Sequence, residues 1–83
     1  ISVSPNPNNG TFIIKGTLGK TEDQEISIEI VNITGQIIYK NKATAQNGLI
    51  NEDIKLINLA SGMYLLNVRH AGESKIFHVM VEQ

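Results

Sequence analysis

Apolar and polar residues alternate along much of the chain, which is the pattern of strands with one buried and one solvated face. The clearest example has Ile26, Ile28 and Ile30 alternating with Ser27 and Glu29. The isoleucines are therefore predicted to face a core, and the two polar residues to face water. Because no stretch has a convincing period of 3.6 residues, we expect an all-β chain.

A turn follows this stretch at residues 32–35, and an apolar segment returns at residues 36–40. Gly35 suits the left-handed position of a tight turn, since glycine reaches positive φ without a steric cost. Residues 26–31 and 36–40 are therefore predicted to pair as an antiparallel hairpin.

The same signals predict further strands between clusters of Gly, Pro and Asn, with Phe12 and Ile14 facing the core. With the hairpin, the predicted strands cover residues 1–4, 11–15, 26–31, 36–40, 50–56, 63–69 and 75–81. The polar spans 17–25 and 41–48 are expected to be loops. This arrangement fits an immunoglobulin-like β-sandwich of about seven antiparallel strands with Greek-key-like connections.

A corner is predicted where the chain enters its most apolar segment. Gly62 can take a positive φ, and Tyr64 supplies a large ring for the core with a hydroxyl that needs a hydrogen-bond partner. The spacing Leu-x-x-Gly-x-Tyr, from Leu59 to Tyr64, therefore indicates a structural turn rather than chemistry.

The last two strands define a register. If Ala71-Gly72 forms their loop, Tyr64 lies opposite Val79 and Leu66 opposite Phe77, and these four side chains share the core face with Val68.

Lys75 shares the core-facing parity of this last, otherwise apolar strand. Its ammonium group must therefore reach an edge or a partner, which makes an exposed recognition role plausible.

Composition narrows the possible functions. Ile, Val and Thr supply 23 residues against 10 for Ala and Leu, which favours strands. The 83 residues predict one domain, and the start at Ile1, without an initiator Met or signal peptide, indicates a piece excised from a longer secreted protein. The net charge of -1 argues against nucleic acid as a partner, and apolar runs far short of the roughly 20 residues of a spanning helix argue against direct membrane insertion.

Candidate chemistry is sparse. The predicted register puts His70 beside Glu73 and His78 opposite Leu65, roughly five residues or about 16 Å apart, too far to share a metal ion. Carboxylates are scattered, no serine lies in a nucleophile-elbow pattern, and there is no Cys. We therefore expect no enzymatic activity, no catalytic residues, no metal and no cofactor.

Four motifs in order carry a resemblance to a known family. They are Pro5-Asn6-Pro7-Asn8-Asn9-Gly10, the stretch 31–38 around Gly35, the stretch 59–68 with Leu59, Gly62 and Tyr64, and Lys75 before the last apolar strand. Together they resemble the type A C-terminal sorting domain of type IX secretion system cargo proteins, found in Gram-negative Bacteroidota. The resemblance extends over essentially the whole chain.

The resemblance implies a non-catalytic secretion signal that follows an N-terminal cargo domain. Its implied partners are the outer-membrane translocon, shuttle proteins and a sortase-like surface protease. It also implies passage through the periplasm to the cell surface or the exterior, with cleavage of the domain and attachment or release of the cargo. The matched motif residues, which we take as candidate recognition residues, are Pro5, Asn6, Pro7, Gly10, Gly35, Leu59, Gly62, Tyr64 and Lys75.

An alternative function comes from a different class. A β-sandwich of this size also occurs as an immunoglobulin-like or fibronectin-like accessory module, which binds carbohydrate or spaces domains in a secreted enzyme or adhesin.

Overall fold

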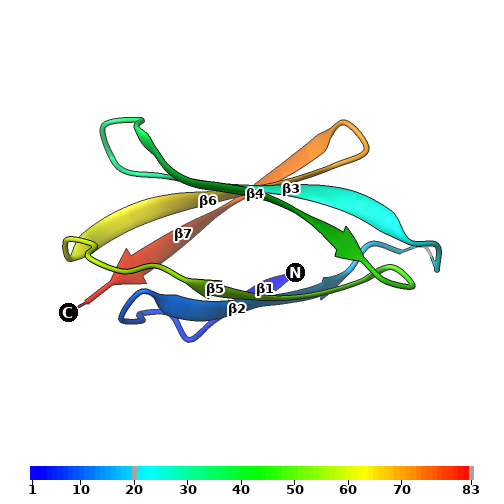
Figure 1. Ribbon diagram of the computed structural model, residues 1–83, viewed down its shortest axis with the longest axis horizontal. Coiled ribbons are helices and arrows are strands. Elements are labelled where there is room, and N and C mark those ends of the chain that lie inside the picture. Colours follow the sequence, from blue (N-terminus) through cyan, green and yellow to red (C-terminus); the bar gives the residue numbers. More distant parts are fainter. Residues whose placement is uncertain (20, 83) are drawn as a thin grey trace.

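The computed structural model describes residues 1–19 and 21–82 as two facing β-sheets (Figure 1). Lys20, within the predicted loop at 17–25, and Gln83 lie outside the described residues. The described strands are β1 (Ser2–Ser4), β2 (Thr11–Thr17), β3 (Gln24–Val31), β4 (Ile37–Ala45), β5 (Leu49–Lys55), β6 (Gly62–His70) and β7 (Glu73–Val81).

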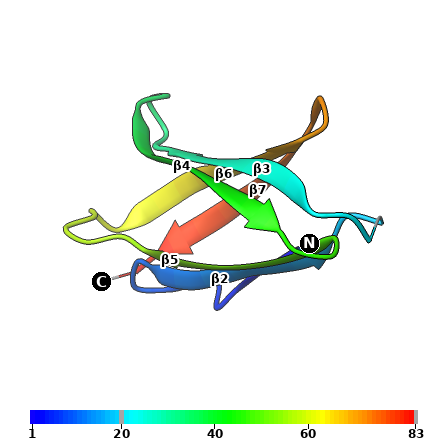
Figure 2. The same cartoon turned by 45° about the vertical axis from the view of Figure 1, so that its right-hand side comes forward.

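The strands divide between a three-stranded sheet, β1-β2-β5, and a four-stranded sheet, β4-β3-β6-β7. Figure 2 shows the two layers, with β2 and β5 beneath the longer strands of the other sheet. Every pair of neighbouring strands is antiparallel. The described residues contain no helix, and hence none that could span a membrane. The predicted all-β, immunoglobulin-like sandwich is confirmed.

The core is formed by alternate residues of each strand. Ile26, Ile28 and Ile30 of β3 are buried, and Phe12 and Ile14 of β2 meet the core from the other sheet, as predicted. Removing such side chains from water is the main favourable term in folding, at roughly 1.5 to 3 kcal/mol each. The buried apolar residues are Phe12, Ile14, Ile26, Ile28, Ile30, Ala45, Ile50, Ile54, Tyr64, Leu66, Val68, Val79 and Val81.

The predicted register of the last hairpin is confirmed. Tyr64 lies opposite Val79 and Leu66 opposite Phe77, and the two strands pair from Gly62↔Val81 to the turn. Phe77 is half-buried, whereas Val79 and Val81, further along the same edge strand, are buried.

The prediction of a loop at residues 41–48 is wrong for residues 41–45, which continue β4. This strand pairs with β3 from Val31↔Ile37 to Gln24↔Ala45, with an irregularity between Ile30 and Val31. Ala45 is buried, and most of the polar side chains before it are exposed. Backbone pairing with a long neighbour therefore outweighs the low strand propensity of Asn and Lys.

The predicted loop at residues 17–25 is also too long at both ends. β2 continues through Gly16 to Thr17, and β3 begins at Gln24. A Cβ atom at position 16 would lie 2.7 Å from Ile1, so glycine lets the start of the chain pass close to β2. Gly16 therefore serves packing rather than ending the strand.

We expect Leu66→Ala to lower the free energy of unfolding by about 3 kcal/mol, because the cavity it leaves lies in the middle of the four-stranded sheet. Leu66 is fully buried, between Ile30 of β3 and Phe77 of β7. The matched control is Leu49→Ala, since Leu49 is 55% exposed, and it should change stability by less than about 0.5 kcal/mol. Urea denaturation measures both, and equal losses would contradict the core described above.

Candidate functional site

The segment between β1 and β2, residues 5–10, lies against the end of β7. Its two Xaa-Pro peptide bonds are cis, and the prolines have no N–H to donate to a sheet. The side-chain amide of Asn6 bonds to the strand instead. Asn6 Nδ2 donates to the carbonyl of His78 at 2.9 Å, and Asn6 Oδ1 accepts from the amide of Met80 at 2.9 Å. The side chain therefore bonds to β7 as a peptide group of a neighbouring strand would.

Asn8 continues this attachment with its backbone. Its amide donates to the Met80 carbonyl at 3.0 Å, and its carbonyl accepts from the Glu82 amide at 2.7 Å. Its buried side chain donates to the carbonyl of Pro5 and accepts from the amide of Gly10. We call these contacts of Asn6 and Asn8 the β7 clamp. Asn8 lies within the first motif but is not among the candidate recognition residues, although an Asn two residues before a Gly is a signal for an Asx turn.

The predicted corner forms between β5 and β6. The Tyr64 hydroxyl donates to the carbonyl of Ala60 at 2.6 Å, and the ring is buried. Gly62 has a φ of 154°, a value that L side chains rarely adopt. Leu59 is half-buried and packs against the core, and Gly62 pairs with Val81 at the end of β7. These three motif residues therefore build the fold at this corner.

The hairpin turn containing Gly35 is held by Asn32. Asn32 Oδ1 accepts from the backbone amides of Thr34 and Gln36, at 3.1 Å and 2.9 Å, and Gly35 has a φ of 87°. Turn chemistry therefore accounts for the residue types at these positions.

The structure brings most of the motif residues to one end of the sandwich. Asn8 and Gly62 lie on either side of Val81, and the turn at 32–34 borders the same hollow as residues 60–64. Figure 1 shows this end at the left, with the C-terminus close to the start of β2 and the corner before β6. The candidate residues gathered here are Pro5, Asn6, Pro7, Gly10, Gly35, Leu59, Gly62 and Tyr64.

Lys75 lies towards the opposite end of β7, next to the β6–β7 turn. It is exposed, pairs across the hairpin with Val68, and has the predicted inward parity. It borders a cavity of about 250 Å³ between the two sheets, which is lined by Ile1, Leu18, Val68, His70, Glu73 and Lys75, together with Thr17 and Ala71. Because Lys75 is exposed and borders a partly apolar lining, its side chain can cover apolar surface while its charge stays in water.

The two histidines occupy different faces of the hairpin. His70 lies opposite Glu73 and lines the cavity, and His78 lies exposed opposite Leu65, both in the predicted register. Two buried side-chain polar atoms of the described residues have no hydrogen-bond partner, His70 Nε2 and Asn67 Oδ1. Within residues 1–19 and 21–82, no three His, Asp or Glu side chains are grouped to hold a metal ion.

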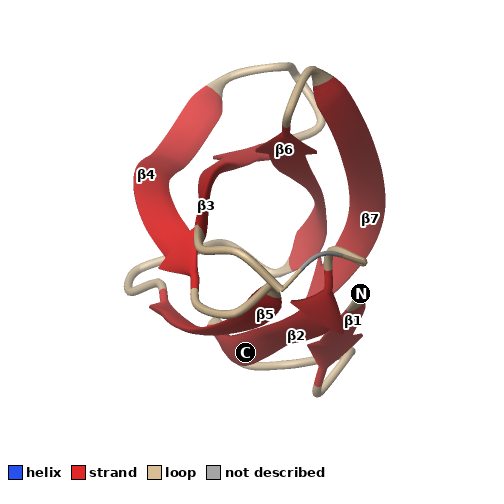
Figure 3. Cartoon of the chain, turned by 90° about the vertical axis from the view of Figure 1, so that its right-hand side faces the viewer, coloured by secondary structure: helices blue, strands red, loops and turns tan. Residues whose placement is uncertain are grey.

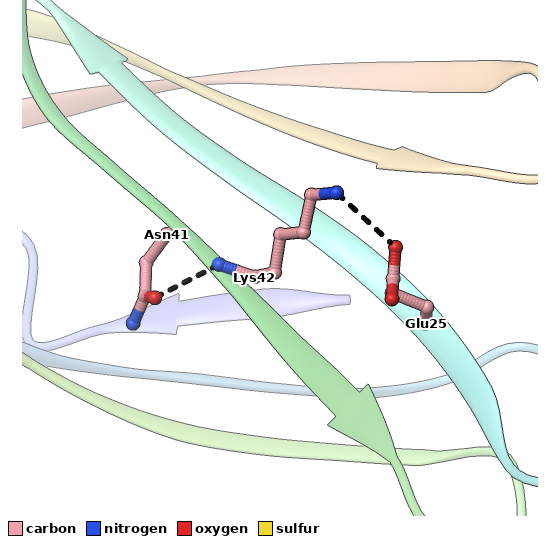
Figure 4. A network of polar contacts seen from close by, with 3 residues as sticks. All are labelled: Glu25, Asn41 and Lys42. Atoms are coloured by element: carbon pink, nitrogen blue, oxygen red, sulfur yellow. Dashed lines mark hydrogen bonds and ion pairs between the residues drawn. The ribbon is translucent and has the colours of Figure 1, made fainter.

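The outer face of the four-stranded sheet carries the ion pair shown in Figure 4. Lys42 Nζ lies 3.7 Å from Glu25 Oε1, and the Lys42 amide donates to Asn41 Oδ1 at 2.9 Å. Both charged side chains are about 70% exposed, so water screens the attraction and its contribution to stability is small. By the same 4.0 Å criterion, Lys75 has no ion-pair partner among the described residues.

We expect Tyr64→Phe to cost about 1 kcal/mol of stability, because it removes only the hydroxyl bonded to Ala60. Tyr64→Ala should cost about 3 to 5 kcal/mol, because it also leaves a cavity in the core. Chemical denaturation of both variants separates the two contributions. A loss under about 1 kcal/mol for the alanine variant would show that the ring does not support the corner.

Asn6→Ala should expose the edge of β7 that the β7 clamp covers, and lower stability by about 1 to 2 kcal/mol through two lost hydrogen bonds. The Met80 amide donates its hydrogen bond to Asn6 Oδ1, so hydrogen exchange at this amide should accelerate more than exchange in the core of β3. Asn51→Ala, at an exposed position of β5, is the matched control and should change neither quantity. Unchanged exchange at Met80 in Asn6→Ala would refute the clamp.

Comparison with known proteins gives one family. No curated protein matches the chain. The model of the secretion system C-terminal sorting domain family matches residues 2–82, a range that includes every described strand of both sheets. The chain therefore belongs to this family, whose members are C-terminal signals for export across the outer membrane by the type IX secretion system.

Proposed function

We propose that residues 1–83 are the single sorting domain of a longer secreted protein, and that this domain directs an N-terminal cargo domain through the type IX outer-membrane translocon. The family match over residues 2–82 is the observation that carries this proposal. The domain acts by recognition and not by catalysis, and the cargo supplies whatever activity the whole protein has.

The proposed route passes through the periplasm, where shuttle proteins and the translocon bind the folded sandwich. A sortase-like protease at the cell surface then removes the domain, and the cargo is attached to the surface or released. Membership of the family supports this sequence of events, since its members work with the type IX machinery.

Lys75 is the motif residue that contributes least to the fold. The other candidate residues form turns, the corner or the β7 clamp, so substitution there changes the fold as well as any contact with the machinery. Lys75 is exposed and makes no ion pair by the 4.0 Å criterion within the described part of the chain. We therefore assign recognition to β7 with Lys75 as its charged contact.

The test is to fuse the chain to the C-terminus of a periplasm-directed reporter in a host with a working type IX system. We expect the reporter outside the cells, and retained in the periplasm of a host that lacks the translocon. A fusion that folds but stays in the periplasm of the competent host would favour the accessory-module function instead.

Lys75→Ala in this fusion should lower export by about threefold or more while leaving stability within about 0.5 kcal/mol, because the lysine is exposed. Lys42→Ala is the matched control, since Lys42 is an exposed lysine on a strand of the same sheet. Reporter in the medium and urea denaturation measure the two effects. Equal export of both variants would remove Lys75 from the recognition surface.

A further inference from the structure

The β7 clamp shows which backbone groups of β7 face its free edge. The carbonyls of His78 and Met80 and the amides of Met80 and Glu82 all bond to Asn6 or Asn8, on the side away from β6. In a strand the amide and carbonyl of one residue point to the same side, and the side alternates along the chain. The backbone groups of Ser74 and Ile76 therefore face the same edge.

This part of the edge has no partner strand. β7 is the outermost strand of its sheet among the described residues, and the β7 clamp reaches no further back than His78. The amide and carbonyl of Ser74 and of Ile76, and the amide of His78, form a short open ladder. Such unpaired groups are a template for another extended segment.

The side chains along the open ladder present two different surfaces. Ile76 is 62% exposed on the outer face of the sheet. Phe77 and Lys75 have the opposite parity, with Phe77 half-buried against the core and Lys75 beside the cavity between the sheets. Figure 3 shows that β7 and β1 lie on the same side of the sandwich. The lining of the cavity includes Glu73 and Lys75 of β7 and Ile1 before β1, which places the cavity beside this edge.

The cavity favours an acidic group. Its polar lining includes the side chains of Lys75 and His70, and the buried Nε2 of His70 has no hydrogen-bond partner in the described part of the chain. Glu73 also lines the cavity, but no ion pair joins it to Lys75 within 4.0 Å. A carboxylate brought in opposite Lys75 would meet an uncompensated cation.

We propose that the open edge of β7, from Ser74 to His78, pairs antiparallel with an extended segment of a partner protein, which carries an acidic side chain opposite Lys75 and apolar side chains opposite Ile76 and Phe77. The identification of that partner with the secretion machinery rests on the function proposed above, but the pairing itself does not. Read from its own N-terminus, the segment has the pattern apolar, apolar, acidic.

A second copy of the chain fits this edge less well. Antiparallel self-pairing centred on Ile76 would put each Lys75 opposite a Phe77, so neither ammonium group would meet a carboxylate. Self-pairing centred on Ser74 would put Lys75 opposite Glu73, but Ile76 and Phe77 would then lie opposite Gly72 and Ala71, which are outside the strand. A partner segment with the proposed pattern places a carboxylate opposite Lys75 and apolar side chains opposite Ile76 and Phe77.

The experiment titrates the 83-residue chain with the blocked peptide acetyl-Thr-Val-Val-Glu-Thr-amide and follows backbone amide resonances by NMR. In the proposed register the second valine lies opposite Ile76 and the glutamate opposite Lys75. We expect saturable shifts centred on the amides of Ser74, Ile76 and His78. Replacing the peptide glutamate by lysine should weaken binding by about fivefold, through repulsion from Lys75.

Ile76→Pro removes the edge-facing amide without removing a bond to β6, and should weaken binding by at least about tenfold. Ile76→Thr keeps that amide and is the matched control, with a loss below about threefold. If the proline variant does not fold, N-methylation of the second peptide valine removes a bond of the same ladder from the other side.

Several outcomes would overturn the proposal. They are no saturable shift up to about 5 mM peptide, shifts away from β7, equal binding of the glutamate and lysine peptides, and no effect of N-methylation. A dimer of the chain alone, with the β7 edge buried, would assign the edge to a second copy. The titration uses no secretion host, so the two experiments test separate claims. Failure of the titration would contradict the edge pairing only, and failure of export would contradict the sorting function only.

Discussion

The attachment of residues 5–10 to the end of β7 is the contact on which the arrangement of this sandwich depends. It joins the beginning of the described chain to its end, through Asn6 and Asn8, without a disulfide. The three-stranded and four-stranded sheets share no strand, so this attachment is one of the few places where backbone hydrogen bonds link the segments of one sheet to the edge of the other. The buried faces supply most of the stability, and the attachment determines how the edge of the core is closed.

The two ends of the molecule consequently differ in character. At one end the Pro-Asn-Pro segment, the corner before β6 and the turn after β3 meet around the end of β7, and nearly every motif residue has a structural partner there. At the other end, within residues 1–19 and 21–82, β7 has an open edge, Lys75 has no ion-pair partner, and the cavity is lined by His70, whose Nε2 lacks a hydrogen bond. The contacts that build the fold are thus concentrated at one end, and the edge that we propose binds a partner lies towards the other.

Much of this fold could be predicted from the sequence, because a period of two assigns each side chain to a face. The alternation of Ile26, Ile28 and Ile30 and the register of Tyr64 with Val79 depend only on that period and on a short turn. The extension of β4 to Ala45 could not be predicted in this way, because the polar residues before Ala45 become a strand only through pairing with β3. Asn6 could be singled out by its motif, but not its partners. It bonds to His78 and Met80, which lie 72 and 74 residues away in the sequence, and a local sequence pattern cannot predict contacts between residues so far apart.

The same long-range contact has a consequence for the order in which a growing chain can complete this domain. Asn6 and Asn8 are synthesised before the His78, Met80 and Glu82 groups that they bind. A chain that stops before these residues lacks the buried Val79 and Val81 of β7 as well as the groups that bind Asn6. The attachment can therefore form only after translation has passed Glu82, so the β7 clamp is a contact that a chain with a truncated β7 cannot make.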